Sequence, residues 1–137
     1  MSNYPHLFSP IRIRNQYMKN RIESAPMSHN GAVPFYTREA MEMFGTFAKG
    51  GAGIVTLGEA GVHAATGHAH PTMPHLDDTF VLSGLINTVE TVHKWGALAS
   101  IELTHSGNRA RGDLLGPDGF VMGPSAMEAN LYGDRVV

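Results

Sequence analysis

Three short strand-like segments separated by two helical patterns constrain the fold of this chain more than any other feature. Residues 53–57 are apolar on both faces, as central parallel strands are, and residues 22–25 and 97–103 are further strand candidates. Apolar side chains at helical spacing predict helices over residues 36–49 and 77–96. Alternating strands and helices with short joins favour parallel strands linked by right-handed crossovers. The predicted fold class is therefore α/β.

Individual residues set the expected boundaries of these elements. Pro26 has no N–H to donate to a neighbouring strand, so the first strand is expected to end there. Gly50 and Gly51 are expected to stop the first helix. Asp77 or Asp78 is expected to cap the second helix.

The segment before the first strand has the pattern of a β-hairpin over residues 8–21. Ile11 and Ile13 alternate with arginines, Asn15–Gln16 can form the turn, and Tyr17–Met18 can return as the second strand.

The strand ends are spaced like those of a TIM (β/α)₈ barrel. They fall near residues 25, 57 and 103, and separations of roughly 32 and 46 residues match βα units with one long loop, residues 59–76. A doubly wound sheet shares this alternation, but no GxGxxG motif follows the first strand. Because a full barrel needs about 250 residues, we expect the N-terminal portion of a barrel, incomplete on its own, with βα units over residues 22–106 and a loop over residues 107–137.

Composition argues against several classes of function. Ten Lys and Arg against twelve Asp and Glu leave a net charge of −2, which argues against a nucleic-acid partner and a polybasic membrane anchor. No apolar stretch has the length of a membrane span, and no secretory signal is visible. The absence of cysteine excludes disulfides, thiolate metal sites and cysteine nucleophiles from these residues. A cytoplasmic protein is expected.

The strand ends carry the residues most suited to a binding site, because functional groups of a barrel gather at the carboxyl ends of its strands. Three strings lie there: Ala25-Pro26-Met27-Ser28, Gly58-Glu59 and Glu102-Leu103-Thr104-His105. Small residues and a glycine let the backbone approach a flat ligand, and the hydroxyl, carboxylate and imidazole can orient it. The strings together indicate a pocket of cofactor size.

Several motifs in order resemble the Old Yellow Enzyme-like NADH:flavin oxidoreductases. They span residues 7–126 and read LFSPIRI, MKNRIESAPMS, FAKGGAGIVTLGEAGV, ASIELTHSGNRA and FVMGPSA. The branch that these motifs resemble most contains 2,4-dienoyl-CoA reductases, enoate reductases and trimethylamine dehydrogenase.

The resemblance implies an FMN-dependent NAD(P)H:ene oxidoreductase, which uses NADH or NADPH to reduce an activated alkene through the flavin. This chain would supply one edge of the FMN site and would be inactive alone. It would need the remainder of the barrel or a partner subunit. The branch also implies an iron–sulfur cluster and FAD as features of the complete protein rather than of this chain.

The resemblance assigns residues at the first two strand ends to the cofactor. Ala25, Pro26 and Met27 would lie along the edge of the isoalloxazine ring. Ser28 would lie near flavin O4, where its hydroxyl can tune the reduction potential, and Gly58 would contact the flavin.

The third strand contributes two further candidates. Glu102 stands where the family has a glutamine that hydrogen-bonds the pyrimidine end of the flavin, but an ionised carboxylate only accepts. We expect it to lower the flavin potential relative to a glutamine. His105 is either a residue near the substrate or a polar core residue.

Other features have alternative interpretations. The histidines of GHAHPTMPH, at positions 68, 70 and 75, could bind zinc or lie in a solvated loop, and we predict no metal site. Arg109 and Arg111 could attract a phosphate or be solvated charges. A partial barrel that binds no cofactor and oligomerises through its open strand edge is the alternative to an enzyme.

Overall fold

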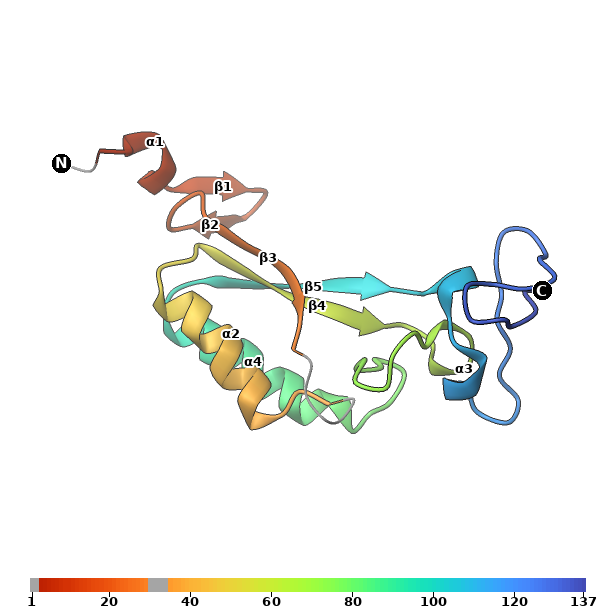
Figure 1. Ribbon diagram of the computed structural model, residues 1–137. Coiled ribbons are helices and arrows are strands. Elements are labelled where there is room, and N and C mark those ends of the chain that lie inside the picture. Colours follow the sequence, from red (N-terminus) through yellow and green to blue (C-terminus); the bar gives the residue numbers. More distant parts are fainter. Residues whose placement is uncertain (1–2, 30–34) are drawn as a thin grey trace.

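The computed structural model describes residues 3–29 and 35–137, and it consists of a parallel sheet flanked by helices, with a hairpin at one end and a looped segment at the other (Figure 1). In chain order the elements are α1 (Pro5–Phe8), β1 (Ile11–Ile13), β2 (Gln16–Met18), β3 (Glu23–Ser28), α2 (Arg38–Lys49), β4 (Ile54–Gly61), α3 (Ala64–Gly67), α4 (Val81–Lys94), β5 (Leu98–Thr104), and the short 3₁₀ turns η1 (Gly107–Arg109) and η2 (Gly112–Leu114).

The sheet has the order β3-β4-β5, and both pairs of strands are parallel. Within the described residues β3 and β5 each pair only with β4, so the sheet is an open arc. The predicted fold class, a hairpin followed by βα units of a partial TIM barrel, is confirmed. The hairpin pairs β1 with β2, placing Ile11 opposite Met18 and Ile13 opposite Gln16.

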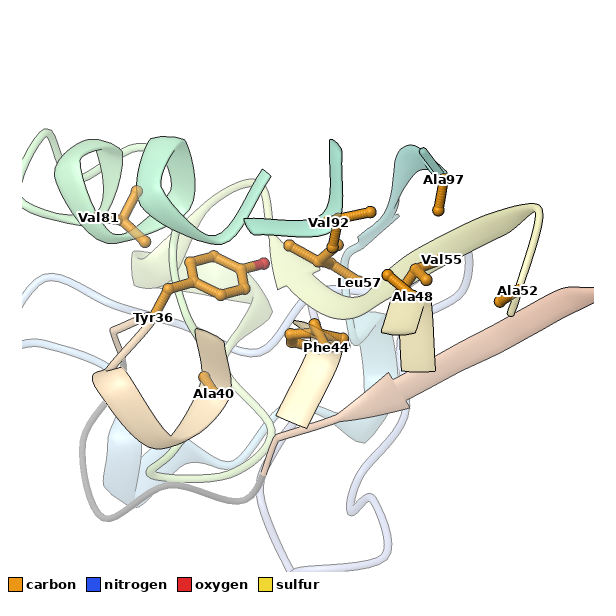
Figure 2. Close-up of a cluster of buried hydrophobic side chains, with 10 residues drawn as sticks. All are labelled: Tyr36, Ala40, Phe44, Ala48, Ala52, Val55, Leu57, Val81, Val92 and Ala97. Carbon is orange, nitrogen blue, oxygen red and sulfur yellow. The ribbon is translucent and has the colours of Figure 1, made fainter. Parts of the chain in front are cut away.

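The hydrophobic core lies between one face of the sheet and the two long helices (Figure 2). Phe44 of α2 and Val92 of α4 meet Val55 and Leu57 of β4, and all four are fully buried. Burial of side chains of this size contributes about 1.5–3 kcal/mol each. This core fixes α2 and α4 against the sheet. We call the helix-covered side of the sheet its outer face.

The opposite side of the sheet, which we call its inner face, carries the alternate strand residues. The expectation that residues 53–57 are apolar on both faces is wrong at Thr56, which lies on this face. Thr56 donates to Glu23 across 2.8 Å, and its hydroxyl oxygen lies 2.6 Å from that of Ser100. A chain of hydrogen bonds therefore crosses all three strands. Sequence inspection offered no partner for Glu23, because the contact joins residues that are 33 positions apart.

The expected end of the first strand at Pro26 is wrong. β3 continues through Pro26 to Ser28, and the register against β4 shifts between Ser24 and Met27. An irregularity of this kind accommodates a residue that has no N–H to donate. It also carries Met27 and Ser28 into the sheet.

The expected cap of the second helix is also wrong. α4 begins at Val81, with Phe80 at the cap position and no side-chain cap. Asp78 instead accepts from the Phe80 N–H at 2.9 Å, and Asp77 accepts from the Ala64 N–H at 2.8 Å. The two carboxylates therefore anchor the turn before α4 and the start of α3.

The two expected loops are more ordered than their composition indicates. β4 extends to Gly61 and is followed by α3, within the segment predicted as a loop from residue 59. Residues 107–137 form the two 3₁₀ turns and a small core of Ala110, Val121 and Val136. None of the described helices has the length and apolar character that a membrane span requires.

Candidate functional site

The carboxyl end of the sheet brings together residues from all three strands. Ser28 of β3 lies in register with Gly58 of β4, and Met27 with Leu57. Ile101 of β5 is also in register with Leu57, and the register then shifts before Ala60, which lies opposite Leu103, so Glu102 falls within the irregular stretch.

Gly58 lies where residues of all three strands approach one another closely. A Cβ at this position would lie 2.8 Å from the Met27 nitrogen and 2.9 Å from the Pro26 Cβ. It would also lie 3.0 Å from Glu102 Oε2. Only a residue without a side chain lets β3 and the Glu102 carboxylate approach β4 this closely. The structure therefore groups Pro26, Met27, Gly58 and Glu102, four of the residues singled out from the sequence.

The surface around Gly58 is uncovered within the described residues. Ala25, Pro26 and Met27 are exposed, and Met27 retains 52% of its accessible surface. Ser28 is half-buried. We call the surface formed by residues 25–28 and Glu102, which meet at the buried Gly58, the strand-end surface.

Glu102 gives the strand-end surface its charge. It is exposed, and its carboxylate makes no hydrogen bond or ion pair with any residue that the structure describes. An ionised carboxylate accepts hydrogen bonds, whereas the Ser28 hydroxyl can also donate one. The surface thus offers an apolar side chain, close-packed backbone, one acceptor and one donor.

His105 is held by a hydrogen-bond network within the loops above the sheet. Its Nδ1 accepts from the Gly107 N–H at 3.0 Å, and its Nε2 lies 2.8 Å from the hydroxyl of the buried Thr66. The same hydroxyl lies 2.8 Å from His63 Nδ1. A Cβ on Gly67 would lie 2.9 Å from the His105 ring, so this glycine makes room for the imidazole.

These contacts assign the protons of the network. A backbone N–H only donates, so His105 Nδ1 is the acceptor and Nε2 carries the proton. Nε2–H then donates to Thr66, whose hydroxyl donates to His63. Both nitrogens of a neutral His105 are therefore occupied by residues of this chain. The structure places His105 as an anchor of the turn after β5.

The loop histidines form a second cluster. The rings of His68 and His75 meet edge to face, with centroids 4.3 Å apart. His75 is buried, and neither of its ring nitrogens has a hydrogen-bond partner among the described residues. Burial lowers the pKa of His75, and the nearby His68 lowers it further. Burial also lowers the pKa of His68, so both rings favour the neutral form.

The third loop histidine pairs with an acid instead. His70 Nε2 lies 3.1 Å from Glu59 Oε1, and His70 Nδ1 lies 3.1 Å from the Thr72 hydroxyl. Among the described residues no group of three or more His, Cys, Asp or Glu side chains is arranged to hold a metal ion.

A polar cleft of about 470 Å³ opens beside the ends of β4 and β5. One of its lining residues, Glu59, directly follows Gly58 in the sequence, and the residues of the strand-end surface meet at Gly58. Its lining comes from four segments of the chain: Glu59, Ala69, His70, Thr104, His105, Ser106, Arg109 and Tyr132.

Comparison with known proteins identifies the family. The model of the NADH:flavin oxidoreductase / NADH oxidase family matches residues 6–135. The chain belongs to this family.

The curated relatives of this family member are much longer than the chain. An NADH oxidase of Thermoanaerobacter brockii is 30% identical over 114 residues, which cover 80% of the chain and 17% of the relative. A metal reductase of Desulforamulus reducens is 32% identical over 133 residues, which cover 96% of the chain and 19% of the relative. The chain thus spans less than a fifth of the length of these two relatives.

A solved structure shares the fold over nearly the whole chain. A 2-naphthoyl-CoA reductase in complex with 2-naphthoyl-CoA superposes with a TM-score of 0.86 at 23% identity. The match covers 98% of this chain and 22% of the reductase. At this level of identity the likeness establishes the shared fold.

Sequence inspection of this family member missed several residues that line or support the cleft. Thr66 lies within Ala-Ala-Thr-Gly, and nothing in that string marks it as the bridge between His63 and His105. Tyr132 lies in a segment without periodicity, so no sequence signal places it on the lining of this cleft. Glu59 was visible as a strand-end acid, but its contact with His70 depends on how the loop folds back.

Proposed function

We propose that the complete protein is an FMN-dependent NAD(P)H:ene oxidoreductase and that this chain supplies one edge of its FMN site. One observation carries the proposal. In a chain of the NADH:flavin oxidoreductase family, Gly58 draws Pro26, Met27 and Glu102 together on an uncovered surface at the carboxyl ends of parallel strands. This edge is where barrel enzymes place their chemistry.

The residues of the strand-end surface fit the chemistry of a flavin ring. Exposed Met27 and the neighbouring backbone provide an apolar face for a planar aromatic group. The unpartnered carboxylate of Glu102 is an acceptor for a ring N–H, and the Ser28 hydroxyl is a donor for a ring carbonyl. When bound, FMN would take a hydride from NADH or NADPH and pass it to the β-carbon of an activated alkene.

Each residue of the chain has a distinct role in this proposal. Ala25, Pro26 and Met27 position the ring and exclude water from its edge. Ser28 donates a hydrogen bond and thereby tunes the electron affinity of the ring. Glu102 holds an N–H at the pyrimidine end and adds negative charge there.

The remaining parts of the reaction are assigned to the complete protein. We propose a small activated alkene as substrate, with the other barrel strands or a partner subunit completing the pocket. An iron–sulfur cluster and FAD would likewise belong to other parts of the protein, because this chain contains no cysteine and its strand ends contain no dinucleotide fingerprint. Cytoplasmic localisation remains part of the proposal.

A partial barrel that acts as an oligomerisation module is the second candidate. A hollow of about 460 Å³ between the hairpin and the edge strand β5 supports it, lined in part by Ile13, Ile54 and Leu98. Apolar surface at an open strand edge favours association.

The two candidate functions predict different effects of an added alkene on the rate at which NADH or NADPH is oxidised. The complete protein, reconstituted with FMN, should oxidise NADH or NADPH in proportion to an added enone and should release the saturated product. The chain of residues 1–137 with FMN should not oxidise NADH or NADPH faster than a control of free FMN, because the sheet of its described residues supplies three strands of a barrel. No enone-dependent turnover by the reconstituted complete protein would contradict the enzyme proposal and favour the oligomerisation module.

A further inference from the structure

Two arginines of the segment after β5 are in different situations, although they lie two positions apart. Arg111 forms a two-pronged pair with Asp113, with contacts of 3.0 Å and 2.7 Å. Arg109 lines the polar cleft, and its guanidinium makes no hydrogen bond or ion pair with any residue that the structure describes. The sequence alone gives no reason to expect different partners for these two arginines, whereas the structure shows that their partners differ.

The acids near Arg109 already have other partners. Asp113 is occupied by Arg111, and Asp134 accepts from the Gly112 N–H at 2.9 Å. Glu59, the acidic residue in the described lining of the cleft, accepts from His70 at 3.1 Å. The cleft therefore contains a guanidinium whose charge no carboxylate of the described chain pairs with.

The backbone that carries Arg109 is firmly placed. Its N–H donates to the Ser106 carbonyl at 2.9 Å, and the Gly107 N–H donates to His105. His105 is in turn fixed by the buried Thr66. The base of the Arg109 side chain is thus preorganised, which reduces the entropy lost when a ligand binds.

Three residues with hydroxyl groups line the same cleft as Arg109. Thr104 ends β5, Ser106 precedes η1, and Tyr132 approaches from the end of the chain. No hydrogen bond joins these three hydroxyls to any described residue. Each can donate a hydrogen bond, so the cleft combines one unpaired cation with three donors.

We propose that this cleft binds an anionic group, a phosphate or a carboxylate, through Arg109. A guanidinium presents paired N–H donors that match two oxygens of either group. The inference rests on the proposed function, in which the anion belongs to the nicotinamide nucleotide or to the alkene substrate. The cleft would hold the charged end of that molecule while its reactive end lies at the strand-end surface.

Calorimetric titration of the complete protein at low ionic strength tests the proposal with two matched pairs of probes. The first pair is reduced nicotinamide mononucleotide and the uncharged reduced nicotinamide riboside, which differ by one phosphate and are added to FMN-free protein. The second pair is hexanoate and hexanamide, which differ in charge. The variants are Arg109→Ala, Arg109→Lys and the control Arg135→Ala, which removes a charge from the same segment at a different hollow.

We expect Arg109→Ala to weaken binding of one anionic probe about tenfold or more, since a hydrogen bond to a charged group is lost. Its neutral counterpart should bind within about twofold of wild type. Arg109→Lys should recover part of the loss, and Arg135→Ala should change little. An effect on the mononucleotide identifies the nucleotide as the source, and an effect on hexanoate identifies the substrate.

Two results would overturn the proposal: equal loss of binding in Arg109→Ala and Arg135→Ala, or no discrimination between charged and neutral probes in wild type. Failure of the proposed function is a separate result. It would appear as absence of bound FMN, and the anion titrations do not require FMN.

Discussion

The two faces of the β3-β4-β5 sheet differ in what covers them and in what their residues do. On the outer face Val55 and Leu57 are fully buried beneath α2 and α4. On the inner face Thr56 bridges Glu23 and Ser100, and Glu102 has no partner within the described residues. Alternate residues of the same strands thus serve stability on one side and leave polar groups available on the other.

The stability and the binding properties of the protein should therefore respond to substitutions on different faces of the sheet. On the outer face, volume and apolar area determine the free energy of folding. At the strand ends of the inner face, close approach and charge determine what can bind. Substitutions on the outer face should therefore change stability most, and substitutions at the strand ends should change binding and potential.

The largest expected effect is on the outer face. Phe44→Ala should lower the free energy of unfolding by about 3–5 kcal/mol, because it removes a fully buried ring and leaves a cavity. Phe80→Ala is the matched control, since Phe80 is 81% exposed, and it should change stability by about 0.5 kcal/mol or less. Chemical denaturation of both variants measures the difference. Equal losses would show that the ring of Phe44 does not hold the helices to the sheet.

Gly58→Ala should have the next largest effect. The new methyl group would lie 2.8 Å from the Met27 nitrogen, so backbone must move. We expect a loss of about 1–3 kcal/mol, typical of overpacking. Gly116→Ala is the control, because nothing lies within 4 Å of the Cβ position there. Thermal unfolding compares the two, and a loss at Gly116 as large as that at Gly58 would contradict the close approach.

Acid should destabilise the loop that joins β4 to α4. The pKa values of His68 and His75 are lowered by burial, so the folded state binds fewer protons than the unfolded state. The free energy of unfolding should therefore fall as the pH drops below the ordinary histidine pKa of about 6.5. His75→Leu should make this fall shallower, whereas His6→Gln on α1 should not. Denaturation curves between pH 5 and pH 8, about the range in which histidine titrates, give the free energy of unfolding at each pH. If this free energy depends on pH in the same way in wild type and in His75→Leu, burial of a neutral His75 is not the cause.

The smallest expected effect is on the flavin potential. Glu102→Gln should raise the midpoint potential at neutral pH, because an ionised carboxylate repels the negative charge of a reduced flavin. We expect a rise on the order of 30 mV, equivalent to about 1.4 kcal/mol for a two-electron couple. Equal potentials at every pH would mean that Glu102 does not face the ring.

Local patterns were sufficient to predict most of the fold. Helical spacing around Phe44 and the apolar run near Val55 identified the elements of the outer face, because burial imposes a period on the sequence. The strand and helix boundaries that were predicted wrongly depend on tertiary contacts. Pro26 remains in its strand because the pairing with β4 accommodates a register shift, and Asp77 accepts from the Ala64 N–H of α3 because the loop folds back on it.

The candidate site was predictable only in part. Gly58 and Glu102 could be identified because strand ends follow from the strand pattern. Their meeting with Pro26 depends on register, which no local pattern reveals. The difference between Arg109 and Arg111 arises from the folding of a segment without periodicity, and there the sequence offered no basis for choosing.

Titration of the complete apoprotein with FMN, monitored by quenching of flavin fluorescence, tests whether the strand-end surface forms part of an FMN site. Met27→Glu and Leu82→Glu place the same charge at similarly exposed apolar positions, 52% on the strand-end surface and 48% on α4. We expect one FMN to bind per wild-type chain. Met27→Glu should weaken FMN binding about tenfold or more, because it places an unpaired carboxylate against the ring. Leu82→Glu should leave FMN binding unchanged. Absence of FMN binding by the folded wild-type protein, or equal affinity in the two variants, would contradict the proposal that the strand-end surface forms part of an FMN site.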